Sequence, residues 1–129
     1  CTSTSSTVRM TVTSLAEASN QTTSSQTVIC PIVRDMSSFS TGSADSRIWL
    51  YDRNATYNIT CSSRARDPSN GSLFTTASQS SSGSGSVQSL NFTGPTVFAT
   101  FPYRFIYCTV PATYNGVASL IRSYRSAEL

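Results

Sequence analysis

The acidic side chains are the groups in this sequence that could act as general acids, general bases or cation ligands. A glycoside hydrolase needs two carboxylates about 5–10 Å apart across a cleft, but no two acids here form a spaced motif. Asp35 follows Arg34 and Asp52 precedes Arg53, each at the end of an apolar run, so local pairing or turn capping accounts for both. The acids are Glu17, Asp35, Asp45, Asp52, Asp67 and Glu128.

The sequence lacks the residue types that other common catalytic mechanisms need. The chain has no histidine and no lysine, which excludes an imidazole base or metal ligand, a Ser-His-Asp triad and a Schiff base. Serine is abundant, but no serine lies in G-x-S-x-G. A calcium site of carboxylates and carbonyls is the alternative, without an EF-hand pattern. We therefore predict that the protein is not an enzyme and that it holds no metal and no cofactor apart from covalent glycans.

Aromatic side chains are a second group with binding chemistry, because their rings offer flat apolar faces to sugars. Several lie in apolar runs and together could form a stacking platform. The competing interpretation is core packing, which we favour because aromatic residues dominate cores of this size. These residues are Trp49, Tyr51, Tyr57, Tyr103, Phe105 and Tyr107.

Asparagine provides the statistical anomaly of the sequence. Five of the six asparagines begin N-x-[ST], the acceptor sequence for N-linked glycans. Because Ser and Thr make up about a third of the chain, chance would place about two of them there. We predict N-glycosylation, with O-linked sugars on the dense Ser and Thr as an addition, and solvated polar faces as the alternative. The five are Asn20, Asn54, Asn58, Asn70 and Asn91.

Strand periodicity fits glycans at some of these positions. A period of two through residues 54–61 places Asn54 and Asn58 on an outward face, with Tyr57 and Ile59 facing inward. Beside Asn91, the same period turns two neighbours inward. They are Leu90 and Phe92.

The cysteines, Cys1, Cys30, Cys61 and Cys108, stand far apart without a C-x-x-C pair, which favours two disulfides over a zinc site. Disulfides indicate an oxidising compartment. Three pairings are open, and the sequence alone does not choose among them. By analogy with immunoglobulin domains, where a disulfide joins the sheets against a tryptophan, we favour Cys30–Cys108 over Trp49, with Cys1–Cys61. A lipid on Cys1 is an alternative.

The elements that position these groups are short runs separated by polar turns about every ten residues, the pattern of an antiparallel sandwich. We predict an all-β fold, an immunoglobulin-like or jelly-roll-like antiparallel β-sandwich of about seven to eight strands with two disulfides. Pro31 lacks a ladder donor, so its strand should be an edge or bulged there. Tyr114-Asn115-Gly116 is typical of a turn. The predicted strands are 27–34, 46–53, 56–64, 87–93, 96–101, 103–110 and 117–126.

The chain divides into a tail, residues 1–26, and a sandwich domain, residues 27–129. The tail is rich in Ser, Thr, Asn and Gln and contains one alternating strand at 7–14, where Val8, Met10 and Val12 share a face. Because this strand stands apart from the other runs, it could either open the chain's own domain or pair elsewhere.

Charge and hydropathy limit the kinds of partner that the protein can have. The formal charge is +3 and comes from scattered arginines without a basic run, so we predict no nucleic-acid partner. No stretch approaches 18 apolar residues, so we predict no membrane span. The abrupt start at Cys1 is typical of a mature product whose leader was removed. We therefore predict an extracellular protein, secreted or at the cell surface.

The cysteine contexts resemble those of a group of small secreted bacterial proteins with disulfides and no assigned activity. The shared features are C-P-[IVL]-V-R-D at 30–35, a middle Cys61, Y-x-x-C-x-[LV]-P around Cys108, and a closing Ser-Tyr at 123–124 with Glu128. Tyr107 departs from this pattern because it is adjacent to Cys108. The resemblance covers roughly residues 27–128 and implies export and a disulfide-bonded domain, without implying a chemistry.

Our leading functional prediction is a structural subunit of an extracellular glycosylated filament or surface assembly. The partners are copies of the chain itself, joined head to tail when the tail strand of one enters the sheet of the next. In this respect the tail resembles a pilin donor strand, with Val8, Met10 and Val12 as subunit contacts. The alternative function is a secreted adhesive or carbohydrate-binding β-sandwich module, with glycans as partners.

Overall fold

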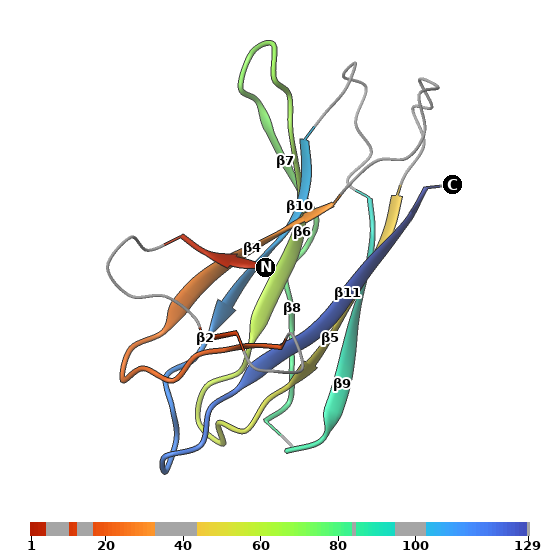
Figure 1. Ribbon diagram of the computed structural model, residues 1–129. Helices are drawn as coiled ribbons and strands as arrows, with labels where there is room; N and C mark the ends of the chain where they lie inside the picture. Colours follow the sequence, from red (N-terminus) through yellow and green to blue (C-terminus); the bar gives the residue numbers. More distant parts are fainter. Residues whose placement is uncertain (5–10, 13–16, 33–43, 84, 95–102, 129) are drawn as a thin grey trace.

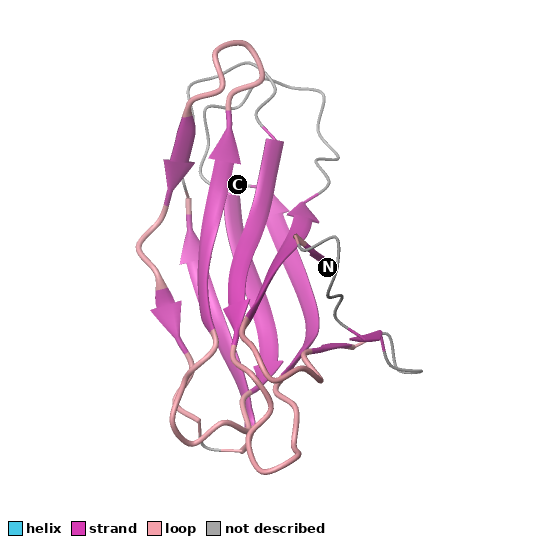
Figure 2. Ribbon diagram, turned by 90° about the vertical axis from the view of Figure 1, so that its left-hand side faces the viewer, coloured by secondary structure: helices cyan, strands magenta, loops and turns pink. Residues whose placement is uncertain are grey.

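All the regular structure of the described residues is β-strand. The computed structural model describes residues 1–4, 11–12, 17–32, 44–83, 85–94 and 103–128. Two antiparallel sheets pack face to face, as Figures 1 and 2 show from two sides. The prediction of an all-β sandwich with two disulfides is confirmed.

One sheet, here called sheet A, contains both disulfides. Its strands are β1 (Thr2–Ser3), β4 (Gln26–Ile32), β6 (Thr60–Arg66), β7 (Leu73–Thr75), β8 (Gln79–Ser80) and β10 (Tyr103–Val110). Their order is β1-β4-β10-β6-β7, and β8 also pairs with β6. The central strand β10 therefore joins β4 to β6, which come from distant parts of the chain.

The other sheet, sheet B, has the order β2-β3-β11-β5-β9. Its strands are β2 (Thr11–Val12), β3 (Ala18–Ser19), β5 (Ala44–Tyr51), β9 (Val87–Thr93) and β11 (Leu120–Glu128). In Figure 1, β11, β5 and β9 run side by side as one layer. Short strands at the sheet edges bring the number above the expected seven or eight.

Strict alternation produces the core between the sheets. In β10, Ile106, Cys108 and Val110 are buried while the residues between them are half-buried, and β9 buries Leu90 and Phe92. β9 and β10 have the predicted bounds, 87–93 and 103–110. The predicted strand 96–101 lies outside the described residues.

The expected disulfide pairing is wrong. Cys1 pairs with Cys30, and Cys61 pairs with Cys108. Strand register explains both pairs, because Cys61 lies directly opposite Cys108 and the β1–β4 register continues from Thr2↔Ile29 to the first disulfide. Each bond therefore joins neighbouring strands of sheet A, in place of the inter-sheet bond of immunoglobulin domains.

The six aromatic residues considered for a stacking platform are not among the buried core residues, which corrects the preferred interpretation. Trp49 and Tyr51 are half-buried on the outer face of sheet B, and Phe105 and Tyr107 are half-buried on the outer face of sheet A. Ile48 and Leu50 on β5 and Ile106 on β10, at alternate positions of the same strands, are completely buried and face inward. Because the rings lie on two opposite faces, they do not form one stacking row either.

The strand expected over 56–64 begins later, at Thr60. Residues 52–59 form a loop, so the period of two does not hold there. Ile59 is buried as expected, but Asn54 is buried rather than outward and Tyr57 is 68% exposed rather than inward. Local hydrogen bonding to polar side chains, described below, replaces the strand.

Two predicted backbone features are confirmed. Tyr114 and Val117 bridge across a turn in which Asn115 and Gly116 both have positive φ angles, as a tight hairpin turn requires. Pro31 pairs with Phe105 of β10, while β1 reaches only Val28 and Ile29. On the β1 side of β4, Pro31 therefore lies at a local sheet edge, where no backbone N–H is needed for strand pairing.

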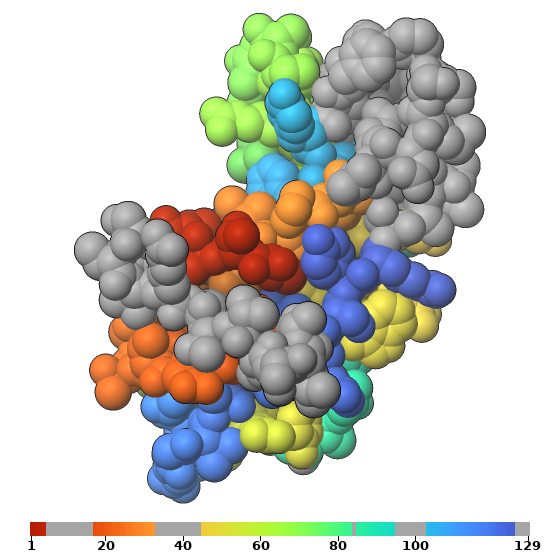
Figure 3. Space-filling view, in the orientation of Figure 1, coloured from red at the N-terminus to blue at the C-terminus, as the bar shows by residue number. Residues whose placement is uncertain are grey.

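The N-terminal residues join both sheets. Figure 3 shows residues 1–4 against β4 and beside β11, and Cys1 packs on the core. Thr11–Val12 pairs with β3 of the same chain. Val8 and Met10, and most of the expected strand 7–14, lie outside the described residues.

Candidate functional site

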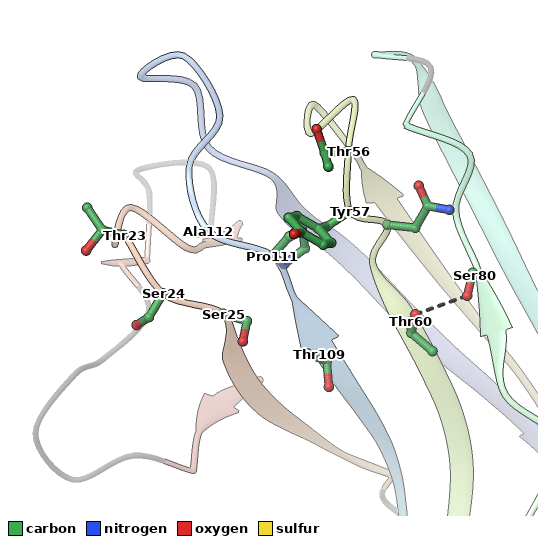
Figure 4. Close-up of a pocket in the computed structure, with 11 residues that line it drawn as sticks. Thr23, Ser24, Ser25, Thr56, Tyr57, Thr60, Ser80, Thr109, Pro111 and Ala112 are labelled. Atoms are coloured by element: carbon green, nitrogen blue, oxygen red, sulfur yellow. Dashed lines mark hydrogen bonds between the residues drawn. The ribbon is translucent and has the colours of Figure 1, made fainter.

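A pocket of about 570 Å³ lies at one end of the outer face of sheet A. Figure 4 shows three walls: the 23–25 segment before β4, the 56–60 segment leading into β6 with Ser80, and the end of β10 with the two residues after it. Its lining residues are Thr23, Ser24, Ser25, Thr56, Tyr57, Asn58, Thr60, Ser80, Thr109, Pro111 and Ala112.

The lining is rich in hydroxyl groups and contains no charged side chain. Thr60 lies opposite Thr109 in the β6–β10 register, and its hydroxyl is 3.0 Å from that of Ser80. Hydroxyl groups both donate and accept hydrogen bonds. The pocket therefore matches a neutral ligand that itself carries many hydroxyls.

Tyr57 gives this polar pocket an aromatic surface. The side chain is 68% exposed, although a tyrosine ring gains much by burial. In Figure 4 its ring and Pro111 lie between the Thr23–Ser25 wall and the Thr60–Ser80 wall. An exposed ring flanked by hydroxyls can stack on the apolar face of a sugar while the hydroxyls bond its edge.

Asp52, at the end of β5, anchors the loop that carries Tyr57. It is completely buried. Its Oδ1 accepts from the Asn54 amide at 3.0 Å and the Ser119 hydroxyl at 3.1 Å. Its Oδ2 accepts from the Ile59 amide at 3.3 Å and from the Ser81 hydroxyl. Both ends of the loop are therefore fixed to one carboxylate, as the turn-capping interpretation of Asp52 expects.

Asn54 connects the loop to the opposite wall. Its Oδ1 accepts from the backbone amides of Thr56 and Tyr57, each at 2.9 Å. Its Nδ2 donates to the Ala112 carbonyl at 3.1 Å. One buried side chain thus sets the position of the Tyr57 backbone relative to Ala112, across the pocket.

Asn20 has the same role at the third wall. It is completely buried, and its Nδ2 donates to the carbonyls of Ser24, Val110 and Pro111 at 2.8–3.0 Å. Its Oδ1 accepts from the Thr22 amide and hydroxyl. The 23–25 segment is therefore held against the end of β10.

These contacts give part of the N-x-[ST] excess a structural cause. Asn20, Asn54 and Asn70 each accept the amide N–H of the Ser or Thr two residues later, which is an Asx turn. Asp67 forms the same turn with Ser69, whose hydroxyl and amide lower the pKa of the Asp67 carboxyl. The motif that predicts glycans thus also marks turns.

The remaining predicted site residues divide by exposure. Asn58, Asn70 and Asn91 are exposed, and Asn58 lines the pocket. Asn91 accepts a hydrogen bond from the Nε of Arg47. Asp35 lies outside the described residues. The sequence does not predict the pocket, because its walls come from four segments that are far apart in the chain. Tyr57 and Asn58 are candidates separately, as a stacking residue and as a glycosylation site.

Within the described ranges, no three Cys, Asp or Glu side chains gather as a metal site would require. The same ranges contain no helix that is long and apolar enough to span a membrane. The chain matches no protein-family model, no curated protein and no solved structure in the three comparisons.

Proposed function

We propose that this protein is a secreted carbohydrate-binding module and that the Tyr57 pocket takes a neutral sugar. One observation carries the proposal: an uncharged pocket rich in hydroxyl groups is lined in part by a tyrosine that is 68% exposed. The two disulfides are consistent with an extracellular or otherwise oxidising environment. Buried hydrogen bonds from Asp52, Asn54 and Asn20 preorganise the walls, which lowers the entropic cost of binding.

Tyr57→Ala tests the proposal against a matched control. Tyr103 is 69% exposed but lies at the other end of β10, outside the pocket, so Tyr103→Ala removes the same ring elsewhere. Lost stacking of about 1 kcal/mol or more should weaken binding at least about fivefold for Tyr57→Ala. Titration of xylo-, cello-, manno- and galacto-oligosaccharides into the secreted protein measures it. Equal affinities for the two variants, or no binding to any of these sugars, would overturn the proposal.

Covalent glycans form a second part of the proposed surface. We propose Asn70 and Asn91 as attachment sites, since their side chains are exposed and lie outside the Tyr57 pocket. Asn58 is also exposed, but it lines that pocket, which a glycan there would block. A sugar on Asn20 or Asn54 would need their buried amide nitrogens, which donate to backbone carbonyls. Peptide mass spectrometry of the secreted protein should find sugar on Asn70 and Asn91 only. Full occupancy at Asn20 would contradict this assignment.

Head-to-tail assembly is the second candidate function. Its support is the edge of β11, which pairs with β3 only through Leu120 and Ile121. From Ser123 to Glu128, no described strand pairs with the β3 side of β11, and an unpaired edge accepts an added strand. Because Cys1 is bonded to Cys30, a donated Thr7–Ser14 segment would leave its domain as a tethered loop.

A further inference from the structure

The outer face of sheet B has a half-buried indole ring at its centre. Trp49 on β5 has serines as its direct partners on both sides, Ser89 on β9 and Ser123 on β11. These small neighbours leave part of the ring exposed, and a hollow of about 480 Å³ lies beside it. Val87 and the Arg122–Glu17 pair also line this hollow.

Two arginines flank the indole. Arg47 and Arg125 lie directly opposite each other on β5 and β11. Their guanidinium carbons are 5.6 and 5.7 Å from the centroid of the Trp49 ring. Like charges directly opposite in a sheet are unfavourable, and neither arginine forms an ion pair with any residue that the structure describes. A bound anion would relieve this repulsion.

The rest of the face increases its positive charge. Arg53 lies over the Tyr51 ring at 4.1 Å, and Arg122 forms an ion pair with Glu17 at 2.8 Å. Asp45 is exposed on β5, so among the described side chains four arginines stand against two acids on this face. Asn91 accepts from the Nε of Arg47 and so orients its guanidinium group.

We propose that this face binds an acidic polysaccharide. A sugar ring stacks on Trp49, and its carboxylate or sulfate lies between Arg47 and Arg125, where guanidinium groups can bind both oxygens of one anion. A single indole with two arginines matches one charged sugar ring. Single-stranded nucleic acid instead needs a row of successive aromatic side chains on which its bases stack. The site goes beyond the proposed neutral-sugar pocket, because it lies on the opposite sheet.

The test compares two variants of equal charge. Arg47→Gln/Arg125→Gln and Arg64→Gln/Arg66→Gln each remove two positive charges, but Arg64 and Arg66 are on β6 of sheet A. The probes are polygalacturonate, dextran sulfate and uncharged dextran, measured by affinity electrophoresis with the secreted protein. We expect the first variant to weaken binding to one or both acidic polymers about tenfold and the control less than twofold. Stronger binding to polygalacturonate would identify a carboxylate as the bound group, and stronger binding to dextran sulfate would identify a sulfate.

Trp49→Ala should cause a loss of similar size, since the ring provides the stacking surface. Tyr57→Ala should leave polygalacturonate binding unchanged, which separates this site from the Tyr57 pocket. Equal losses in the two arginine variants would indicate unspecific charge attraction and overturn the proposal. Equal competition by single-stranded oligo-dT, or retention of binding in Trp49→Ala, would also overturn it.

Discussion

At the scale of single residues, buried polar side chains shape the candidate site. Asp52, Asn54 and Asn20 are each almost completely buried and satisfied by hydrogen bonds from or to the backbone. A buried polar group costs free energy unless it is paired, so such networks define one conformation. The walls of the Tyr57 pocket are therefore held by groups that do not touch its interior space.

Asp52→Asn should destabilise the protein and weaken sugar binding together. The amide keeps the shape of the carboxylate but places an NH₂ group where one carboxylate oxygen now accepts two hydrogen bonds, so hydrogen bonds to that oxygen are lost. We expect a loss of about 3 kcal/mol in the free energy of unfolding, measured with urea. Asp45→Asn, at an exposed acid, is the control and should change it by less than about 0.5 kcal/mol. Equal effects would show that the Asp52 network does not stabilise the fold.

Gly83→Ala should disturb the loop that Asp52 anchors. Gly83 has a φ of 62°, and a Cβ there would lie 2.7 Å from the Asn54 carbonyl oxygen. Gly85 has a φ of 64° but open space around its Cβ position. We expect about 1 kcal/mol for Gly85→Ala, from the backbone conformation alone, and about 2–3 kcal/mol for Gly83→Ala. Equal urea midpoints would rule out the close approach.

At the scale of elements, the disulfides join strands that are already neighbours. The Cys1–Cys30 bond holds β1 to β4 and closes a sequence separation of 29, while Cys61–Cys108 joins β6 to β10 with a separation of 47. Both bonds lie in sheet A, so packing of side chains holds sheet B onto it. Peptide mapping without reduction checks this pairing.

Removing each disulfide by a double Cys→Ala substitution should give unequal losses. Loop entropy alone predicts about 4 kcal/mol for each bond. Cys61 and Cys108 are completely buried, whereas Cys1 is half-buried, so the Cys61→Ala/Cys108→Ala variant also loses core packing. We expect it to be about 1 kcal/mol less stable than Cys1→Ala/Cys30→Ala in urea unfolding. The reverse order would contradict this account.

At the scale of the whole molecule, the two sheets present different chemistry on opposite faces. The outer face of sheet A ends in an uncharged hydroxyl pocket, and that of sheet B carries an indole with two arginines over it. A protein with both sites could join a neutral and an acidic polymer. Such cross-linking would not require any self-assembly of the protein.

Assembly through the tail is tested on the intact secreted protein. Val8→Asp/Met10→Asp/Val12→Asp charges the apolar face of the tail, and Thr7→Asp/Thr11→Asp/Thr13→Asp adds the same charge to the other face. Strand donation predicts fibres in electron microscopy for the natural chain and the control, and single particles for the first variant. Single particles for the natural chain would exclude it and favour the glycan-binding module.

Much of the fold could be predicted because alternation is local. The period of two in 87–93 and 103–110 sets which side chains face inward, so strand bounds and core residues follow from neighbouring residues alone. The same reasoning is wrong for 54–59, because Asp52 and Asn54 offer the backbone other hydrogen-bond partners. Short-range polar competition overrides the pattern there.

The sequence by itself determined the β-sandwich class, the presence of two disulfides and the lack of histidine or lysine chemistry, since these depend on composition and period. Only the tertiary structure decided which cysteines pair, because pairing depends on strand order, and which asparagines are buried. It also decided where the candidate sites lie. The Tyr57 pocket joins four distant segments, and the Arg47–Arg125 pair exists only through the β5–β11 register. Contacts between residues far apart in sequence are set by packing, which no local pattern contains.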